Sequence, residues 1–362
     1  MHAATAAGTA AFAAGFDAAH FRRLDDLTVS SVGLGTYLGD ADDATDTRYG
    51  DAIRTAARLG TNVFDAAINY RNQRSERILG RTLAALASDG TLPRERVVVC
   101  TKGGFIPFDG TQPDDPRRFV EETYVATGIL RADQIVGGAH AITPRFLTDQ
   151  IARSRANLGV ETIDLYYVHN PETQLAVVSR NRFATVVRET FEALEAAVAA
   201  GHVARYGVAT WNGFRRPPDA RDHLSLEALV RAAEAVGGAH HHLRAIQLPY
   251  SLAMPEAFAT PTQRVGHELV TVLEAAARLR VAVFASAPLF QGRLARPLPP
   301  ALADAFPGCE TSAARALQFV RSTPGIACAL AGTSRAAHVV ENLAVARVPP
   351  APAGVDSLFT RG

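Results

Sequence analysis

Short apolar runs alternate along the chain with longer stretches in which apolar residues recur at helical spacing. Runs of four to eight apolar residues bounded by polar ones are typical of buried strands. Eight runs fit this description, and we predict strands over residues 32–36, 61–65, 96–102, 162–169, 203–210, 245–248, 281–285 and 326–331. The pattern therefore predicts many short strands separated by regular elements of another kind.

An amphipathic stretch follows each predicted strand. In one of them, Val187, Phe191, Leu194 and Val198 recur every three or four residues and form a single apolar stripe, as expected of a helix laid on a sheet. On the same grounds we predict helices over residues 47–59, 75–87, 143–158, 183–200, 225–236, 268–279, 313–322 and 335–346.

Eight strand–helix units in series predict an α/β protein with a closed (β/α)8 TIM barrel in a single domain. A doubly wound open sheet is the alternative, but no G-x-G-x-x-G motif opens the first helix. We expect the barrel to span 21–350, after a flexible N-terminal extension over 1–20 and before a C-terminal tail over 351–362. Residues 21–31 predict a β-hairpin that plugs the barrel's N-terminal end.

The segment between the third strand and the third helix, residues 103–142, is too long for an ordinary connection within such a unit. Long ordered loops of this kind are usually lids or binding loops. We therefore predict that it closes over the active site.

Charge and cysteine content narrow the choice of function. The chain has 362 residues with 37 Lys and Arg against 36 Asp and Glu, so we expect no binding of nucleic acid or anionic membrane. Cys100, Cys309 and Cys328 lie far apart, which disfavours disulfides and zinc sites, and Cys100 and Cys328 lie in apolar runs and are expected to be buried.

No apolar run reaches the length of a membrane span, and residues 1–19 lack the basic start of a secretory signal. We therefore expect a cytoplasmic location and a small-molecule partner. The adjacent histidines 240–242 cannot easily aim three rings at one ion, so no metal is predicted. Nothing in the sequence predicts an oligomeric state.

Three consecutive strands end in an ionisable residue: Asp65, Lys102 and His169. In a TIM barrel these ends face the mouth where active sites lie. Asp65 and Lys102 would also be compatible with a structural ion pair, and His169 with a buried core histidine. Three such ends in a row favour a functional site, because a charge on an apolar strand costs free energy unless it is paired or used.

A series of short segments in the chain forms a recognisable pattern: VGLGTY at 32–37, GTNVFDAAINY at 60–70, SE at 75–76, LG at 79–80, VCTK at 99–102, DLYYVH at 164–169, RYGV at 205–208, the stretch 247–250 and HVVENL at 338–343. The most specific of these elements is an Asp followed five positions later by a Tyr. In these segments the sequence resembles the aldo-keto reductase family, and the resemblance runs from residue 21 to about 346.

This resemblance implies a catalytic tetrad of Asp65, Tyr70, Lys102 and His169. Hydride addition to a carbonyl carbon builds negative charge on oxygen, so a proton donor is required, and Tyr70 is the implied donor. We expect Lys102 to lower the pKa of the Tyr70 phenol and Asp65 to hold the ammonium of Lys102 in place. His169 would orient the substrate oxygen. Alternatively, Tyr70 is an aromatic that only lines the rim of the pocket.

The resemblance also implies a nicotinamide cofactor, with NADP(H) favoured and NAD(H) possible. The match is incomplete here, because Ala209-Thr210 replaces the family's Ser-Asn pair and Ser286 replaces an aromatic that stacks on nicotinamide; Trp211 or Tyr250 are candidate substitutes. A loop after the seventh strand would wrap the pyrophosphate, and Arg335 would supply the cation for a 2′-phosphate. The implied cofactor residues are Gly35, Thr36, Tyr37, Thr210, Gln247, Ser286, Pro288, Leu289, Gln291, Gly292, Arg293, Gly332, Ser334, Arg335, His338, Glu341 and Asn342.

The predicted function is NAD(P)(H)-dependent interconversion of an aldehyde, ketone or sugar with its alcohol. Tyr37, Asn170 and Trp211 are expected to contact the substrate. One alternative is a redox-sensing barrel with little turnover, similar to the β subunits of potassium channels, which the altered cofactor residues favour. A barrel hydrolase is weaker, because only Asp65 among the strand ends is acidic and glycoside hydrolysis needs two carboxyl groups.

Overall fold

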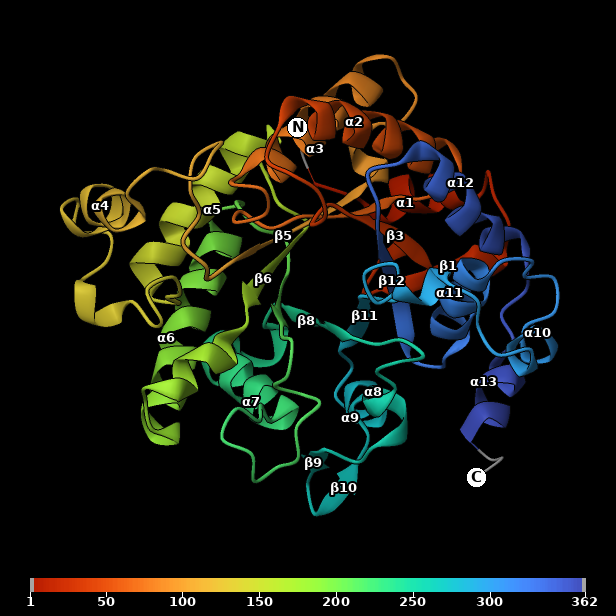
Figure 1. Ribbon diagram of the computed structural model, residues 1–362. Coiled ribbons are helices and arrows are strands. Elements are labelled where there is room, and N and C mark those ends of the chain that lie inside the picture. Colours follow the sequence, from red (N-terminus) through yellow and green to blue (C-terminus); the bar gives the residue numbers. More distant parts are fainter. Residues whose placement is uncertain (1–2, 360–362) are drawn as a thin grey trace.

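The computed structural model describes residues 3–359 and contains a closed barrel of eight parallel strands (Figure 1). The strands follow one another around the barrel in chain order, and the last pairs with the first. This confirms the predicted (β/α)8 fold. The barrel strands are β3 (Val32–Gly35), β4 (Val63–Asp65), β5 (Val98–Gly103), β6 (Leu165–His169), β7 (Tyr206–Ala209), β8 (Leu243–Pro249), β11 (Ala282–Ser286) and β12 (Ile326–Gly332).

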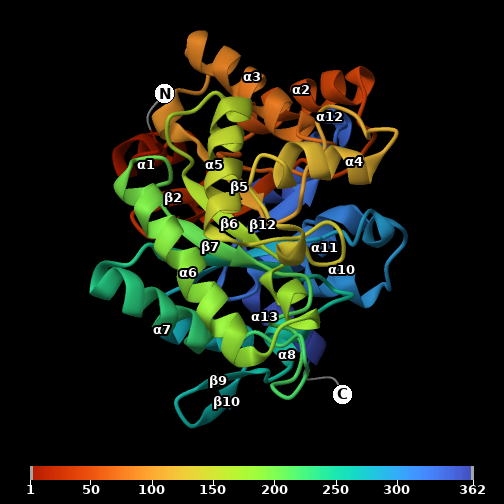
Figure 2. The ribbon, with the colours of Figure 1, turned by 90° about the vertical axis from the view of Figure 1, so that its left-hand side faces the viewer.

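A helix follows each barrel strand and packs outside the barrel, as the apolar stripes predict. In Figure 2, α5 and α6 lie side by side across the near face of the barrel, where they contact each other. These helices are α2 (Asp43–Arg58), α3 (Arg74–Ser88), α5 (Pro144–Leu158), α6 (Arg180–Ala199), α7 (Leu226–Gly237), α9 (Val272–Arg278), α11 (Ser312–Ser322) and α12 (Ala336–Leu343).

Several predicted helices have different limits in the structure; the one predicted over 47–59, for example, begins at Asp43, where Asp42 caps it. The one predicted over 268–279 begins only at Val272, because Thr271 and Glu274 form a capping box there. The residues before it form β10 (Glu268–Val270), which pairs with β9 (Gln263–Val265). The one predicted over 335–346 ends at Leu343 and continues as a 3-10 turn.

The predicted N-terminal hairpin is present as β1 (Phe21–Leu24) and β2 (Leu27–Ser30). Its apolar side chains Leu24, Leu27 and Val29 are fully buried, in one cluster with residues of the barrel interior such as Val63 and Val98. The hairpin therefore closes the N-terminal end of the barrel, and in Figure 2 it lies on the opposite side from α4 (Pro116–Val120).

Helices occupy part of both segments that were predicted as an extension and a tail. Where a flexible extension was expected over 1–20, α1 (Ala6–Ala13) packs against β2, and Phe12 is buried beside Phe16 and Phe21. In the predicted tail over 351–362, α13 (Pro352–Phe359) buries Val355. Residues 1–2 and 360–362 of these two segments lie outside the described part of the chain. Buried apolar side chains thus hold both described segments on the barrel.

The long segment 103–142 folds into a compact unit instead of an open loop. It contains α4, a π-helical turn and a 3-10 turn, and it has a small apolar core around Tyr124, Leu130 and Phe146. Gln150 of α5 accepts from the N–H of Gly104 and donates to the carbonyl of Phe105, and these two hydrogen bonds fix the start of the segment to α5. None of its residues lines the cavity described below, which contradicts the prediction that it closes over the active site.

The remaining short helices are α8 (Glu256–Ala259) and α10 (Ala301–Ala305). Cys100, Cys309 and Cys328 are unpaired and buried, which confirms the prediction for Cys100 and Cys328. Among residues 3–359, no helix has both the length and the apolar character needed to cross a membrane.

Candidate active site

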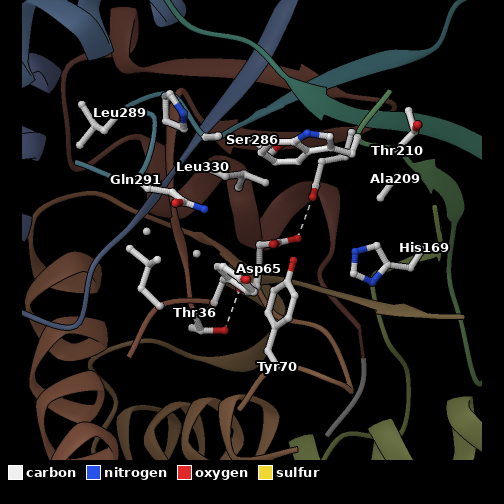
Figure 3. Close-up of a pocket in the computed structure, with 18 of the residues that line it drawn as sticks. Thr36, Asp65, Tyr70, His169, Ala209, Thr210, Ser286, Leu289, Gln291 and Leu330 are labelled. Atoms are coloured by element: carbon white, nitrogen blue, oxygen red, sulfur yellow. Dashed lines mark hydrogen bonds between the residues drawn. The ribbon is translucent and has the colours of Figure 1, made fainter. Parts of the chain in front are cut away.

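A cavity of about 880 Å³, open to solvent, lies at the C-terminal ends of the barrel strands (Figure 3). This is the end at which TIM barrels carry their active sites. Most residues predicted for catalysis, cofactor and substrate meet there. The lining residues are Gly35, Thr36, Tyr37, Leu38, Asp65, Tyr70, His169, Asn170, Ala209, Thr210, Trp211, Gln247, Ser286, Ala287, Pro288, Leu289, Gln291, Gly292, Leu330 and Gly332.

Lys102 lies just beneath the cavity floor and is only 1% exposed. Its ammonium nitrogen is 2.6 Å from Asp65 Oδ2, 2.8 Å from the carbonyl oxygen of Ala66 and 3.3 Å from the Tyr70 hydroxyl. An ammonium has three donors, and here each one has an acceptor. The Tyr70 oxygen receives one of them, so its own proton stays available to a group in the cavity.

Asp65 is held at both oxygens. Lys102 donates to Oδ2, and the side-chain amide of Gln247 donates to Oδ1 at 2.9 Å. Gln247 was predicted to hold the nicotinamide carboxamide; it does line the cavity, but its amide nitrogen is directed at Asp65. Its carbonyl oxygen and its second N–H are not used by this contact.

His169 completes the group. Its ring centre is 5.9 Å from that of Tyr70 and 5.0 Å from that of Phe105, both edge-on. The carbonyl of His169 is 2.8 Å from Nε2 of His140, and Gln174 donates to Nδ1 of His140 at 2.8 Å. Because Nδ1 of His140 accepts, its proton is on Nε2 and is donated to His169. The segment 103–142 thus supports His169 from behind.

The environment sets the charges of these groups. Burial raises the pKa of Tyr70, and the opposing effect of Lys102 does not cancel this rise. Burial alone would lower the pKa of Lys102, but Asp65 and Tyr70 outweigh burial and raise it. Burial and then the charge of Lys102 depress the pKa of His169 well below its ordinary value. At neutral pH the site therefore holds a protonated phenol, an ammonium and a neutral imidazole.

The direction for Tyr70 differs from the prediction, which had Lys102 lowering its pKa. The sequence places Lys102 near Tyr70 correctly, and its contribution has the predicted sign. Desolvation of the phenol is larger, because a tyrosinate in this buried position loses contact with water.

The loop after β11 has the backbone of an anion-binding turn. Ala287, Phe290, Gln291 and Gly292 all have positive φ, at 51°, 45°, 54° and 81°. Within residues 3–359, the backbone N–H groups of Leu289, Gln291 and Gly292 donate to no protein acceptor. Unpaired amides at an open cavity fit an anionic ligand such as a pyrophosphate.

Several predicted cofactor residues do not line the cavity. Arg293 is exposed and lies 5.1 Å from the Phe290 ring centre. Arg335 and His338 are also exposed, and Asn342 is 4% exposed, packed between α12 and the barrel wall. Neither Ser334 nor Glu341 contributes to the cavity lining. A role for these residues in binding the far end of a nucleotide stays a prediction.

Tyr250 is excluded as a substitute for the missing stacking aromatic. It is fully buried, stacks on Phe319 at 5.3 Å and hydrogen-bonds Thr323 at 3.0 Å. Trp211, by contrast, lines the cavity and is 43% exposed.

The sequence did not single out Glu172 or His140, although both touch the site from behind. Glu172 is buried and accepts hydrogen bonds from the loop after β7. Burial raises the pKa of this carboxyl, and the hydrogen bonds it accepts oppose the rise. The sequence contains one signal for Glu172: it lies three positions after His169, at the same end of β6. Leu38, Ala287 and Leu330 also line the cavity without having been predicted.

Comparison with known proteins places the chain in a family. The model of the aldo/keto reductase family matches residues 31–235, more than half of the 362 residues. The chain belongs to this family, as its sequence motifs indicated. It is also 30% identical over 155 residues to the NADH-specific methylglyoxal reductase of Escherichia coli; the match covers 40% of this chain and 39% of that protein.

Solved structures agree with the fold. A glycerol dehydrogenase from Gluconobacter oxydans superposes with a TM-score of 0.64 at 20% identity, over 95% of this chain and 96% of that one. An aldo-keto reductase from Bacillus halodurans gives 0.63 at 19% identity, over 94% and 95%. An aldo/keto reductase from Klebsiella pneumoniae, in complex with NADP and acetate, gives 0.55 at 20% identity, over 93% of each chain.

Proposed function

We propose that this protein is an NAD(P)(H)-dependent oxidoreductase that interconverts a neutral carbonyl compound and its alcohol, with Tyr70 as the general acid and base. One observation carries the proposal: the ammonium of Lys102 bridges Asp65 and the Tyr70 oxygen at the floor of an open cavity, beside His169. Family membership and the reductases and dehydrogenase among its relatives support it.

Tyr70 is arranged to give up a proton in the reducing direction. A reduced nicotinamide, when bound, supplies the hydride to the carbonyl carbon. The carbonyl oxygen gains negative charge and takes the phenolic proton, because the Tyr70 oxygen already accepts from Lys102 and directs its own hydrogen outward. The resulting tyrosinate is stabilised by the adjacent ammonium, whose charge Asp65 maintains. The raised pKa of Tyr70 keeps the donor protonated before reaction.

His169 serves to orient the substrate oxygen. Its depressed pKa leaves the ring neutral, so one ring nitrogen donates and the other accepts. Its Nδ1 is buried and has no partner among the described residues, which leaves Nε2 as the ring nitrogen available to a ligand, and the ring stands edge-on to Tyr70. A carbonyl oxygen between the two rings would receive hydrogen bonds from both.

The cavity favours an uncharged substrate. Among residues 3–359, no Lys or Arg lines it, and the one lining carboxylate, Asp65, is already bound by Lys102 and Gln247. A carboxylate-bearing substrate would lose hydration without gaining an opposite charge. Tyr37, Asn170 and Trp211, the predicted substrate contacts, line the cavity and are compatible with a small neutral aldehyde, ketone or sugar.

The nucleotide would lie along the other side of the cavity. The free amides of Leu289, Gln291 and Gly292 fit its pyrophosphate, and Arg335 at the start of α12 is the cation available for a 2′-phosphate. Because of Arg335, NADP(H) stays our preference, and NAD(H) is the alternative. The relatives include both kinds: one is described as NADH-specific and another was solved with NADP.

The test is steady-state turnover. The purified protein is mixed with NADPH or NADH and a panel of neutral aldehydes and ketones, each paired with an analogue that carries a carboxylate. We expect continuous nucleotide oxidation with an equal amount of alcohol formed, and faster reaction with the neutral member of each pair. Consumption of no more than one equivalent of nucleotide per chain would contradict the proposal and favour the redox-sensing alternative.

A further inference from the structure

Glu172 is a buried carboxylate that binds three consecutive residues of a neighbouring loop. It lies in the 3-10 segment Pro171–Ala176, directly after β6, and is 8% exposed. Its Oε1 accepts from the hydroxyl of Thr210, from the backbone N–H of Trp211 at 3.1 Å and from that of Asn212 at 3.3 Å. Each such hydrogen bond contributes about 0.5–1.5 kcal/mol, so this single carboxyl group anchors the loop after β7.

The same contacts remove Thr210 as a donor to a ligand. A threonine hydroxyl has one proton, and here it is donated to Glu172, while its oxygen accepts from the N–H of Gly213 at 2.7 Å. The adjacent Ala209 has no polar side chain. Thr210 was predicted to contact the nicotinamide; its hydroxyl instead fixes the shape of its own loop.

The loop also carries Trp211 to the cavity. Its side chain is 43% exposed and lines the same cavity as Ser286. A large aromatic surface left open at a cavity favours a flat apolar ligand group, because stacking removes that surface from water. Holding it there without a ligand requires a rigid loop backbone.

We propose that Glu172 is a positioning residue that holds Trp211 in place as the aromatic wall of the nicotinamide site. The N–H groups of Trp211 and Asn212 that bind Glu172 belong to the peptides before and after the Trp211 Cα, so these contacts fix the direction in which its side chain leaves the backbone. The inference rests on the proposed function only for the identity of the ligand. The anchoring of the loop stands on the protein's own contacts.

Trp211 is the single tryptophan of the chain, so its fluorescence reports on this loop alone. The test compares the full-length wild type with Glu172→Met, which fills similar space without accepting the three hydrogen bonds. Without nucleotide, we expect a red-shifted emission and lower anisotropy for the variant. With NADPH or NADH, quenching of the same emission measures Kd, and we expect it to rise about 10-fold.

Two further variants distinguish a positioning role of Glu172 from a general loss of stability. Glu172→Gln keeps an acceptor oxygen and is expected to recover most of the emission and affinity. Glu195→Met is the matched control, because Glu195 also accepts from a hydroxyl, that of Tyr206 at 2.9 Å, and from a backbone N–H, that of His242 at 2.7 Å, but outside the cavity. We expect it to lower stability without changing Trp211 emission or nucleotide Kd.

The outcomes distinguish the inference from the proposed function. A folded Glu172→Met protein with wild-type emission, anisotropy and Kd overturns the inference. Should that variant not fold, Glu172→Ala is measured in the same way, with the same result decisive. Failure of the wild type to bind either nucleotide overturns the proposed function, while the emission of the nucleotide-free variants still tests whether Glu172 holds the loop.

Discussion

The two sides of the cavity are built differently. On the side formed by β4 and β5, polar side chains already have protein partners: Lys102 uses all three of its donors, and both oxygens of Asp65 accept. On the side of β11, the backbone amides of Leu289, Gln291 and Gly292 are unpaired within the described chain. The side with Asp65 and Lys102 is therefore paired without a ligand, whereas the proposed nucleotide side is left to be completed by one.

The largest effect is expected from breaking the paired side. Lys102→Met leaves the carboxylate of Asp65 buried without its cation, which should cost about 3–5 kcal/mol of unfolding free energy. Turnover should fall by roughly 10³-fold or more, because the tyrosinate loses its stabilising charge. Urea denaturation and steady-state rates measure both effects.

The control for this variant is Arg77→Met. Arg77 and Asp109 form an ion pair whose side chains are 38% and 63% exposed, so its loss should cost about 1 kcal/mol or less and leave turnover unchanged. Equal losses from the two variants would mean that the Lys102 pair is merely one more salt bridge.

A smaller effect is expected when low pH protonates His140, which contacts the backbone of His169, because this protonation lowers the free energy of unfolding. Burial lowers the pKa of His140 from 6.5 to about 4 in the folded protein. Between these values the unfolded chain binds more protons, so stability falls as the pH drops from 7 to 4, by about 3 kcal/mol for this residue. His20, with a pKa also lowered to about 4, acts in the same direction.

His140→Gln isolates the share of His140, since glutamine can still donate to the carbonyl of His169. Its unfolding free energy, measured by urea at several pH values, should fall less steeply with acid than that of the wild type. His240→Gln, at an exposed position, should leave the slope as it is. A His140→Gln slope equal to the wild type would show that folding does not lower the pKa of this histidine.

The smallest effect concerns the nucleotide side. Arg335→Ala should weaken NADPH binding by about 5-fold or less, because an exposed ion pair contributes about 1 kcal/mol at most. NADH binding should not change, since it lacks the 2′-phosphate. Titration of both nucleotides tests this, with Arg347→Ala as an exposed control. Equal weakening of both would remove Arg335 from the 2′-phosphate site.

The barrel and the tetrad could be predicted because their signals are local. Each strand is a short apolar run, and Asp65 and Tyr70 lie on one turn at a fixed spacing. Strand ends meet at one mouth in any such barrel, so Lys102 and His169 could be placed there as well.

What the sequence could not show depends on contacts between distant segments. The hydrogen bonds of Glu172 join residues about 40 positions apart, and those of His140 to His169 join residues 29 apart. The pKa of Tyr70 depends on how deeply the barrel buries it, which no spacing reveals. Helix α1 is held by Phe12, which packs on Phe16 and Phe21. The Ala-rich sequence around Phe12 does not predict these contacts.

The central claim is that the Tyr70 phenol gives its proton to the substrate oxygen. Tyr70→Phe removes one oxygen and leaves the ring, so turnover should fall by about 10²–10⁴-fold while nucleotide Kd and thermal stability stay within about 2-fold and a few degrees of wild type. Nucleotide oxidation at saturating carbonyl substrate is the direct measurement. A Tyr70→Phe enzyme that turns over at the wild-type rate would contradict the account.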